Sequence, residues 1–231
     1  YIKSHNRLYS TKHKGFSELP SDIKSQLIGN LLGDGHLSRG SPTSNTRLAF
    51  TYSTRDVNYQ YVLHIRYEVY RILFGNPDGP LKPYSHYDSR TGNTYEHVHF
   101  DTLVHTVFNT YHEAWYRKAI PGIDPSNRRY IKIVPHNVGD LLDAIALTYW
   151  IMDDGVWESA RGVLLCTEDF TLAEVELLRN VLFTNFGLTT ITKARSGPDK
   201  VRIIIPSAMV GKLRNIVSPH MHPQMMYKIG L

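Results

Sequence analysis

The first half of the chain switches several times between a helical and an alternating pattern of apolar residues. Its first helical pattern begins near Ser21, which suits a helix N-cap, and Asp22 follows in the first turn. Gly35 can end this helix in a left-handed conformation. The patterns predict a helix over 21–33, a strand over 47–54, a helix over 57–74, strands near 81–87 and 94–101, and a helix near 103–116.

The second half shows the same succession of patterns. Thr171 and Glu174 form a T-x-x-E capping box at the start of a helical pattern, and Gly187 is placed to end it. Pro198 and its neighbours predict a turn between two strands. The expected elements are a helix over 140–153, a strand over 162–167, a helix over 171–186, strands near 188–195 and 200–206, and a helix over 207–217.

The order helix–strands–helix–strands–helix therefore occurs twice. Strands joined by short turns pair antiparallel, so we expect an α+β protein with two pseudo-symmetric α-β-β-α-β-β-α halves. The expected parts are a basic N-terminal extension over 1–20, a first half over 21–116, a linker over 117–139 and a second half over 140–231. The lysines and arginine of the extension fit either a remnant of a targeting segment or a plain basic terminus.

Composition narrows the class of protein. No stretch approaches the roughly 18 unbroken apolar residues of a membrane span, so we expect no membrane partner. The single cysteine, Cys166, excludes an internal disulfide and suits a reducing compartment. It also argues against a structural zinc site. The net charge of +5 and the pI of about 9.2 are compatible with a phosphate-rich partner without specifying one.

Two apolar helix ends carry the candidate chemistry. Residues 27–35 and 147–155 both close on Asp-Gly, at Asp34 and at Asp154. Gly29 and Gly33 share one face of the first helix and would let a second helix approach closely. If the two helices pack side by side, both carboxylates meet where helix-end carbonyls already concentrate negative charge. Such an all-oxygen site suits Mg²⁺ and phosphodiester chemistry.

These two stretches resemble the paired motifs of the LAGLIDADG homing endonucleases. The resemblance extends over nearly the whole chain and includes residues 223–228, which end in Lys228 and look like the single-chain, two-motif, intron-encoded branch of that family. It implies a monomer whose two curved sheets lie in the major groove of a long double-stranded DNA target. It also implies Mg²⁺-dependent cleavage of both strands that leaves 3′ overhangs.

The resemblance further implies roles for single residues. Asp34 and Asp154 would be the metal ligands, helped by the backbone carbonyls of Gly33 and Asp153. Lys132 and Lys228 match the basic residues that stand near the scissile phosphate, although either could be a surface lysine. Mn²⁺ would replace Mg²⁺, whereas Ca²⁺ would bind without supporting cleavage. Many relatives are encoded in organelle introns, which implies a mitochondrion or another organelle.

The second motif departs from the family's small-residue face. It has Tyr149 and Asp153 where the first motif has Gly29 and Gly33. We therefore expect a helix contact that is less tight or slightly rotated, with Ala146 as a substitute contact.

Polar residues on the predicted strands are candidates for DNA contacts. Basic and amide side chains can read base edges in the major groove, and others bind phosphates. A plain solvated sheet face is the alternative. The candidates are Arg47, Thr51, Ser53, Arg55, Lys82, Tyr84, His86, Tyr95, His97, His99, Lys193, Arg195, Lys200 and Arg202. The histidines among them suit an exposed sheet face better than a metal site.

Three other functions are compatible with parts of this pattern. An RNA maturase that assists intron splicing could use the same scaffold. A non-catalytic, repressor-like DNA-binding module would keep the sheets without the cleavage. A small-molecule enzyme fits least, because no glycine-rich cofactor fingerprint follows a strand and no cofactor-binding residue is therefore expected.

Overall fold

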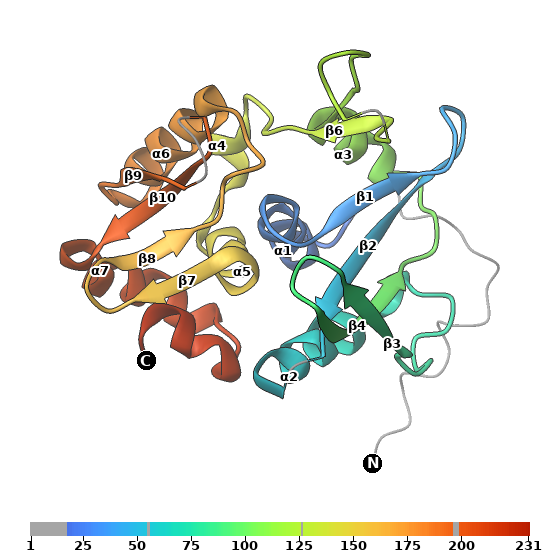
Figure 1. Cartoon of the computed structure of the whole chain (residues 1–231), viewed down its shortest axis with the longest axis horizontal. Coiled ribbons are helices and arrows are strands. Elements are labelled where there is room, and N and C mark those ends of the chain that lie inside the picture. The colour runs from blue at the N-terminus through green and yellow to red at the C-terminus, as the bar shows by residue number, and fades with distance from the viewer. Residues whose placement is uncertain (1–17, 55, 126, 196–198) are drawn as a thin grey trace.

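The computed structural model describes residues 18–54, 56–125, 127–195 and 199–231. Most of the N-terminal extension, Arg55 and the centre of the turn at 196–198 lie outside them. Within the described residues, no helix combines the length and the hydropathy that crossing a bilayer requires. Two halves, each a four-stranded sheet with helices on one face, meet along a central pair of helices (Figure 1).

The first half follows the predicted order of elements. Its strands form one antiparallel sheet in the order β1-β2-β4-β3. The expected helix over 57–74 is an α-helix that continues as a π-helical segment, Ile65–Val69, and a 3₁₀ turn, Arg71–Leu73. The regular elements are α1 (Ser21–Leu32), β1 (His36–Arg39), β2 (Thr46–Ser53), α2 (Asp56–His64), β3 (Pro83–Asp88), β4 (Asn93–Asp101) and α3 (Val107–Trp115).

The second half repeats this arrangement. Its sheet has the order β7-β8-β10-β9, so each strand has a counterpart in the first sheet. The elements are α4 (Val138–Leu141), α5 (Ala144–Asp154), β7 (Gly155–Glu158), β8 (Gly162–Leu165), α6 (Leu172–Phe186), β9 (Ile191–Ala194), β10 (Val201–Pro206), α7 (Ser207–Val217) and 3₁₀ segments at Ser218–His220 and Pro223–Ile229. The expected α+β fold with two pseudo-symmetric halves is confirmed.

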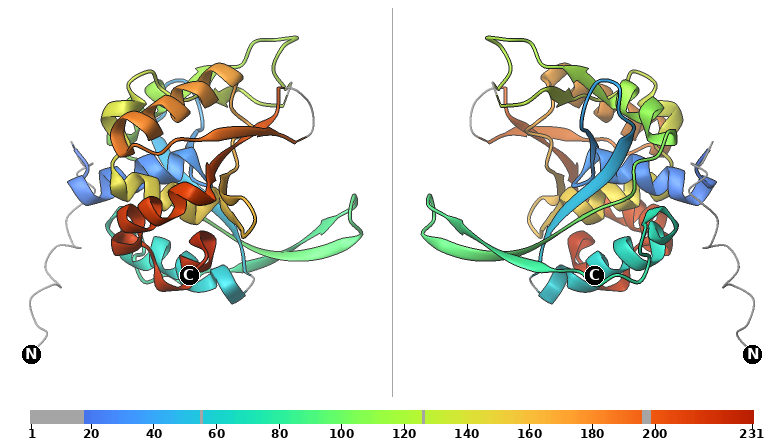
Figure 2. Two further views of the ribbon diagram at one scale, coloured as in Figure 1. Left: turned by 90° about the vertical axis from the view of Figure 1, so that its left-hand side faces the viewer. Right: turned by 90° about the vertical axis from the view of Figure 1, so that its right-hand side faces the viewer.

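The segment between the halves is structured. It contains β5 (Tyr116–Lys118) and β6 (Tyr130–Lys132), which pair antiparallel, followed by α4. In side view, the stretch between β5 and β6 and the long β3–β4 hairpin project from the body on the same side (Figure 2). The linker boundaries at 117 and 139 remain a prediction.

Several local expectations were wrong. Ser21 is the first helical residue, and the N-cap position belongs to Pro20, which offers no side-chain cap. Gly35 is not left-handed; its backbone packs against Asn30 instead. The helix expected over 140–153 is split, because Asp143 accepts a hydrogen bond from Ala146 N and caps a new helix, α5.

The contact between α1 and α5 is tight. A Cβ at Gly29 would overlap the carbonyl oxygen of Ala146 and lie 2.6 Å from Cβ of Tyr149. A Cβ at Gly33 would overlap the side chain of Asp153. The expected looser contact is therefore wrong, because the glycines of one helix alone make room for the larger residues of the other.

We predict that Gly29→Ala lowers the free energy of unfolding by about 1–3 kcal/mol, because overpacking at this contact forces the helices apart. Denaturant titration would measure it. Gly211→Ala is the control: Gly211 also lies within a helix, α7, but nothing surrounds the added methyl, so that change should be neutral or stabilising. Equal effects of the two changes would contradict the role given to Gly29.

Candidate active site

The two Asp-Gly ends lie next to each other at the junction of the halves. Asp34 follows the end of α1 and keeps an exposed side chain, whereas Asp154 is the last residue of α5 and is half-buried. Along the chain, β1 begins shortly after Asp34, at His36, and β7 begins directly after Asp154, at Gly155. The packing of α1 against α5 therefore brings the two sequence-predicted carboxylates to one place, at the same end of both helices.

Asp153, expected to contribute only its backbone carbonyl, also contributes a carboxylate to this place. Its side chain is buried and accepts four hydrogen bonds. One oxygen, Oδ2, accepts from Asn30 Nδ2 at 2.8 Å and from the backbone N–H of Asp34 at 3.1 Å. The other, Oδ1, accepts from the hydroxyls of Tyr61 at 2.8 Å and Tyr52 at 3.2 Å. All of these donors belong to the first half, so Asp153 joins the two halves.

The two predicted lysines contact equivalent backbone carbonyls of the two motifs. Lys132 Nζ donates to the carbonyl oxygens of Gly33 at 3.1 Å and Gly35 at 2.8 Å. Lys228 is buried, and its Nζ donates to the carbonyl oxygen of Asp153 at 2.7 Å. The carbonyls expected to assist a metal thus face a cationic group in each half. This is the environment that helix-end carbonyls favour.

Burial shifts the pKa values of these groups toward their neutral forms. Burial, reinforced by the charge of Asp34, raises the pKa of Asp154 to about 7, against the opposing effect of Lys132 and Lys228. Burial also raises the pKa of Asp153 well above its ordinary value, and the charge of Asp34 adds to the rise. Burial also raises the pKa of Asp34, while the charges of Lys228 and Lys132 lower it.

The lysines respond in the opposite direction. Burial lowers the pKa of Lys132 and of Lys228, although the neighbouring aspartates raise both. Together these shifts mean that protein surrounds the carboxylates and the ammonium groups alike. The attraction between them does not fully offset the cost of burying their charges. Groups with such shifts, gathered in one place, are typical of a functional site.

The histidines do not form an alternative centre. Among the residues that the structure describes, no three His, Cys, Asp or Glu side chains gather as a metal site. At the two Asp-Gly ends, the oxygen groups available to a divalent ion are the carboxylates of Asp34 and Asp154 and the adjacent backbone carbonyls. Mg²⁺ is commonly held in this way, by one or two carboxylates together with substrate phosphates and water.

Strand register places most of the first-half candidates on one sheet face. Thr51 lies opposite His99, and Thr51 Oγ1 is 2.9 Å from His99 Nδ1. Tyr84 lies opposite His97, with ring centroids 6.0 Å apart. The parity that the sequence left open is thereby decided. The residues that share this face are Arg47, Thr51, Ser53, Tyr84, His86, Tyr95, His97 and His99. Lys82 precedes β3, and Arg55 lies outside the described residues.

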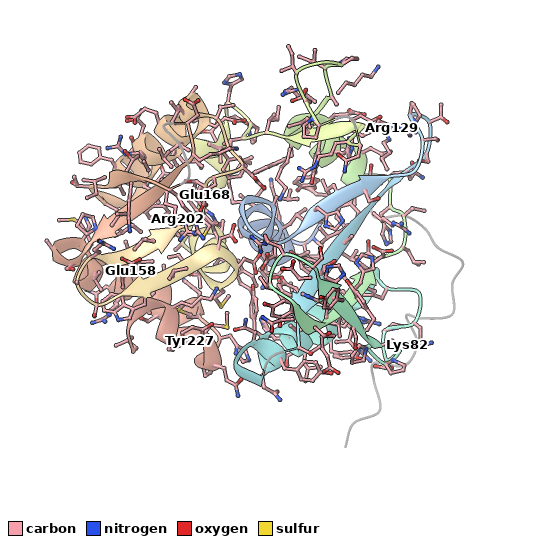
Figure 3. All side chains as sticks on the ribbon, viewed as in Figure 1. Lys82, Arg129, Glu158, Glu168, Arg202 and Tyr227 are labelled. Atoms are coloured by element: carbon pink, nitrogen blue, oxygen red, sulfur yellow. The ribbon has the colours of Figure 1, made fainter. Side chains whose placement is uncertain are left out.

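The second-half candidates also share one face, and Glu168 contacts three of them. Lys193 lies opposite Arg202 in the register of β9 and β10. Glu168 pairs with Arg202 at 2.6 Å and with Arg195 at 3.4 Å, and its carbonyl accepts from Lys200 Nζ at 2.6 Å. Figure 3 shows Glu168 beside Arg202 in the second half, far from Lys82 in the first. Alternation alone did not reveal this acid.

Comparison with known proteins agrees with this arrangement. Residues 24–213 match the model of the LAGLIDADG DNA endonuclease family. The chain belongs to this family. The motifs that predicted the family, at 27–35 and 147–155, both fall within the matched region.

Individual members of the family resemble most of the chain. It is 29% identical over 213 residues to the cytochrome b mRNA maturase bI2 of Saccharomyces cerevisiae, covering 92% of this chain and 48% of the maturase. It is 28% identical over 218 residues to the DNA endonuclease I-ChuI of Chlamydomonas applanata, covering 92% of this chain and 96% of that enzyme. The chain thus spans about half of the first relative and nearly all of the second.

A solved structure of a family member has the same fold. The homing endonuclease I-WcaI, bound to its DNA recognition sequence, matches with a TM-score of 0.75 and 23% sequence identity, over 93% of this chain and 88% of that one. This likeness confirms the LAGLIDADG fold for the chain, both halves included.

The raised pKa of Asp154 predicts a stability that depends on pH. In the folded protein the carboxyl keeps its proton up to about pH 7, whereas unfolded Asp loses it near 3.8. Ionisation in the folded state therefore costs stability as pH rises from about 4 to 7. Without divalent metal, Asp154→Asn should raise the melting temperature more at pH 8 than at pH 5. An equal rise at both values would contradict the shifted pKa.

Proposed function

We propose that this chain is a monomeric, site-specific double-strand DNA endonuclease, a homing endonuclease that hydrolyses phosphodiesters of a long target and leaves 3′ overhangs. The observation that carries the proposal is the pairing of Asp34 with Asp154 at one point, with a lysine donating to the helix-end carbonyl of each motif. Repeated chemistry on a duplicated fold suits a substrate with two similar strands to cut. Family membership and the similarity to I-ChuI support the activity.

The residues at the junction fit a divalent metal. Asp34 and Asp154 are the carboxylates that would hold it, with the carbonyls of Gly33 and Asp153 as further oxygen donors. The donor set is all oxygen, and it already attracts two ammonium groups. We expect Mg²⁺ or Mn²⁺ to support cleavage and Ca²⁺ to bind without it. When bound, the metal supplies Lewis-acid stabilisation of the phosphate and acidifies water.

The residues of the chain would do the remaining work. In our proposal Lys132 and Lys228 leave their carbonyl partners and place their charge beside the scissile phosphates, where they stabilise the developing negative charge. Their lowered pKa values also ease proton exchange with an attacking water. The polar sheet faces on either side would lie in the major groove and position each strand at its carboxylate.

A second candidate function rests on one observation. The cytochrome b mRNA maturase similarity covers 92% of this chain, so RNA maturase activity is the alternative on the same scaffold. Binding to the host intron RNA, compared with binding to duplex DNA, would separate the two. For either function we propose a mitochondrion or another organelle as the compartment, in keeping with the intron-encoded relatives.

The proposed activity predicts a clear effect at either carboxylate. With a target selected from a randomised DNA library by the wild-type protein, Asp34→Asn or Asp154→Asn should abolish Mg²⁺-dependent double-strand cleavage, because an amide is a poor ligand for Mg²⁺. Binding of the same duplex, measured by gel shift, should persist. Full cleavage by either variant would refute the assignment of the site, and absence of cleavage by the wild type with Mg²⁺ or Mn²⁺ would refute the endonuclease.

The proposed DNA surface predicts a steep dependence on salt. Affinity should fall as salt rises, because each neutralised phosphate releases counterions. Lys193→Ala should reduce the slope of log affinity against log salt by about one contact. Lys24→Ala is the matched control, since Lys24 is exposed in the first turns of α1, away from the sheet faces. A slope unchanged by Lys193→Ala would remove that residue from the surface.

A further inference from the structure

The two Asp-Gly ends differ in how their backbones are held. Asp154 is the last helical residue of α5. Asp34 lies beyond α1, which ends at Leu32 with Gly33 as its cap. The N–H groups of Gly33 and Gly35 both return to helical carbonyls, including that of Asn30. The N–H of Asp34 does not; it donates to the carboxylate of Asp153 across the interface.

The second motif cannot receive an equivalent hydrogen bond from a side chain of the first. The position in the first motif that corresponds to Asp153 is Gly33, which has no side chain to offer. The space beside Gly33 is in fact filled by Asp153, since a Cβ there would overlap the Asp153 side chain. Gly33 thus leaves the space that the Asp153 side chain fills. As a result, only the first motif has a carboxylate packed against its backbone.

Asp153 is itself held firmly. The hydroxyls of Tyr61 and Tyr52 donate to Oδ1 of Asp153, and Asn30 Nδ2 donates to Oδ2. The hydroxyl of Tyr70 in turn donates to Asn30 Oδ1 at 2.7 Å. The side chains of all four of these residues are buried. A carboxylate with four donors around it has no room for a metal, so its role is to position another group.

We infer that Asp153 is a positioning residue for Asp34 alone, and that it therefore controls cleavage of one DNA strand more than the other. The inference rests on the proposed endonuclease activity. If each aspartate serves the scissile phosphate on its side, loosening the backbone of Asp34 should slow one cut while Asp154 continues to support the second.

The first test is Asp153→Ala, with each strand of the target labelled separately. The alanine removes the acceptor of the Asp34 N–H, so one strand should be cut at least about tenfold more slowly than the other, and nicked DNA should accumulate. Equal slowing of both strands in a folded, DNA-binding variant would overturn the inference. Wild-type protein without any cleavage would instead overturn the proposed function, so the two failures are distinguishable.

The second test keeps the geometry and removes the charge. In Asp153→Asn the side-chain oxygen can still accept from Asp34 and Asn30, while its NH₂ can donate to tyrosine hydroxyls. It should cut both strands at comparable rates, whereas Asp154→Asn, one residue away, should make no double-strand cut. An Asp153→Asn variant as inactive as Asp154→Asn would make Asp153 a ligand and would overturn the positioning role. This comparison decides the matter even if Asp153→Ala fails to fold.

Discussion

The close packing of α1 against α5 is the contact on which the candidate site depends. Gly29 and Gly33 bring the two helix backbones together, so both helices end at the same point. Each sheet begins directly after its helix, at His36 and at Gly155, and the helix pair therefore also sets the distance between the two sheets. A change in helix separation would move the carboxylates and the DNA-facing surfaces at the same time.

This packing gathers charges at some cost. Asp153, Asp154, Lys132 and Lys228 stand where protein displaces much of the solvent, with the exposed Asp34 beside them. Burial raises the pKa of Asp153 and Asp154 and lowers those of both lysines, so each charged form is held against its preference. Such a cluster does not stabilise the fold, which depends instead on the apolar core around it. Cations and phosphates that bind at the site would offset these unfavourable buried charges, and perturbed pKa values gathered in one place are typical of a functional site.

The features that could be predicted from the sequence are local or repeated. Thr171 and Glu174 form their capping box, and Gly187 takes the left-handed conformation at the end of α6, because both depend on neighbouring residues. The duplication of the motif predicted the two sheets and the meeting of Asp34 with Asp154. The four-residue strands β1 and β7 were too short for an alternating pattern to reveal them individually.

The features that could not be predicted depend on residues far apart in the chain. The partners of the Asp153 carboxylate come from α1, β2 and α2, and no spacing in the sequence indicates that they converge. The sequence suggested that Asp153 and Tyr149 would loosen the helix contact, since both are large. In the structure the glycines of α1 accept them. A mismatch between two motifs is therefore not a defect of packing; it is an asymmetry that one helix accommodates for the other.

The same asymmetry extends to the sheet faces. The first face presents histidines and tyrosines, and Arg47 pairs there with Asp101 at 3.1 Å. The second presents cations paired with Glu168. Arg47 and Arg195 are exposed, and exposed ion pairs contribute little stability, so a DNA phosphate or base edge can displace the acid from these two arginines at small cost. A DNA site that offers no compensating contact would meet the carboxylate instead. In the proposed complex Asp101 and Glu168 thus lower the affinity for every DNA sequence. The loss is largest for sequences that offer no compensating contact. A protein of modest positive charge can in this way favour one long target over bulk DNA.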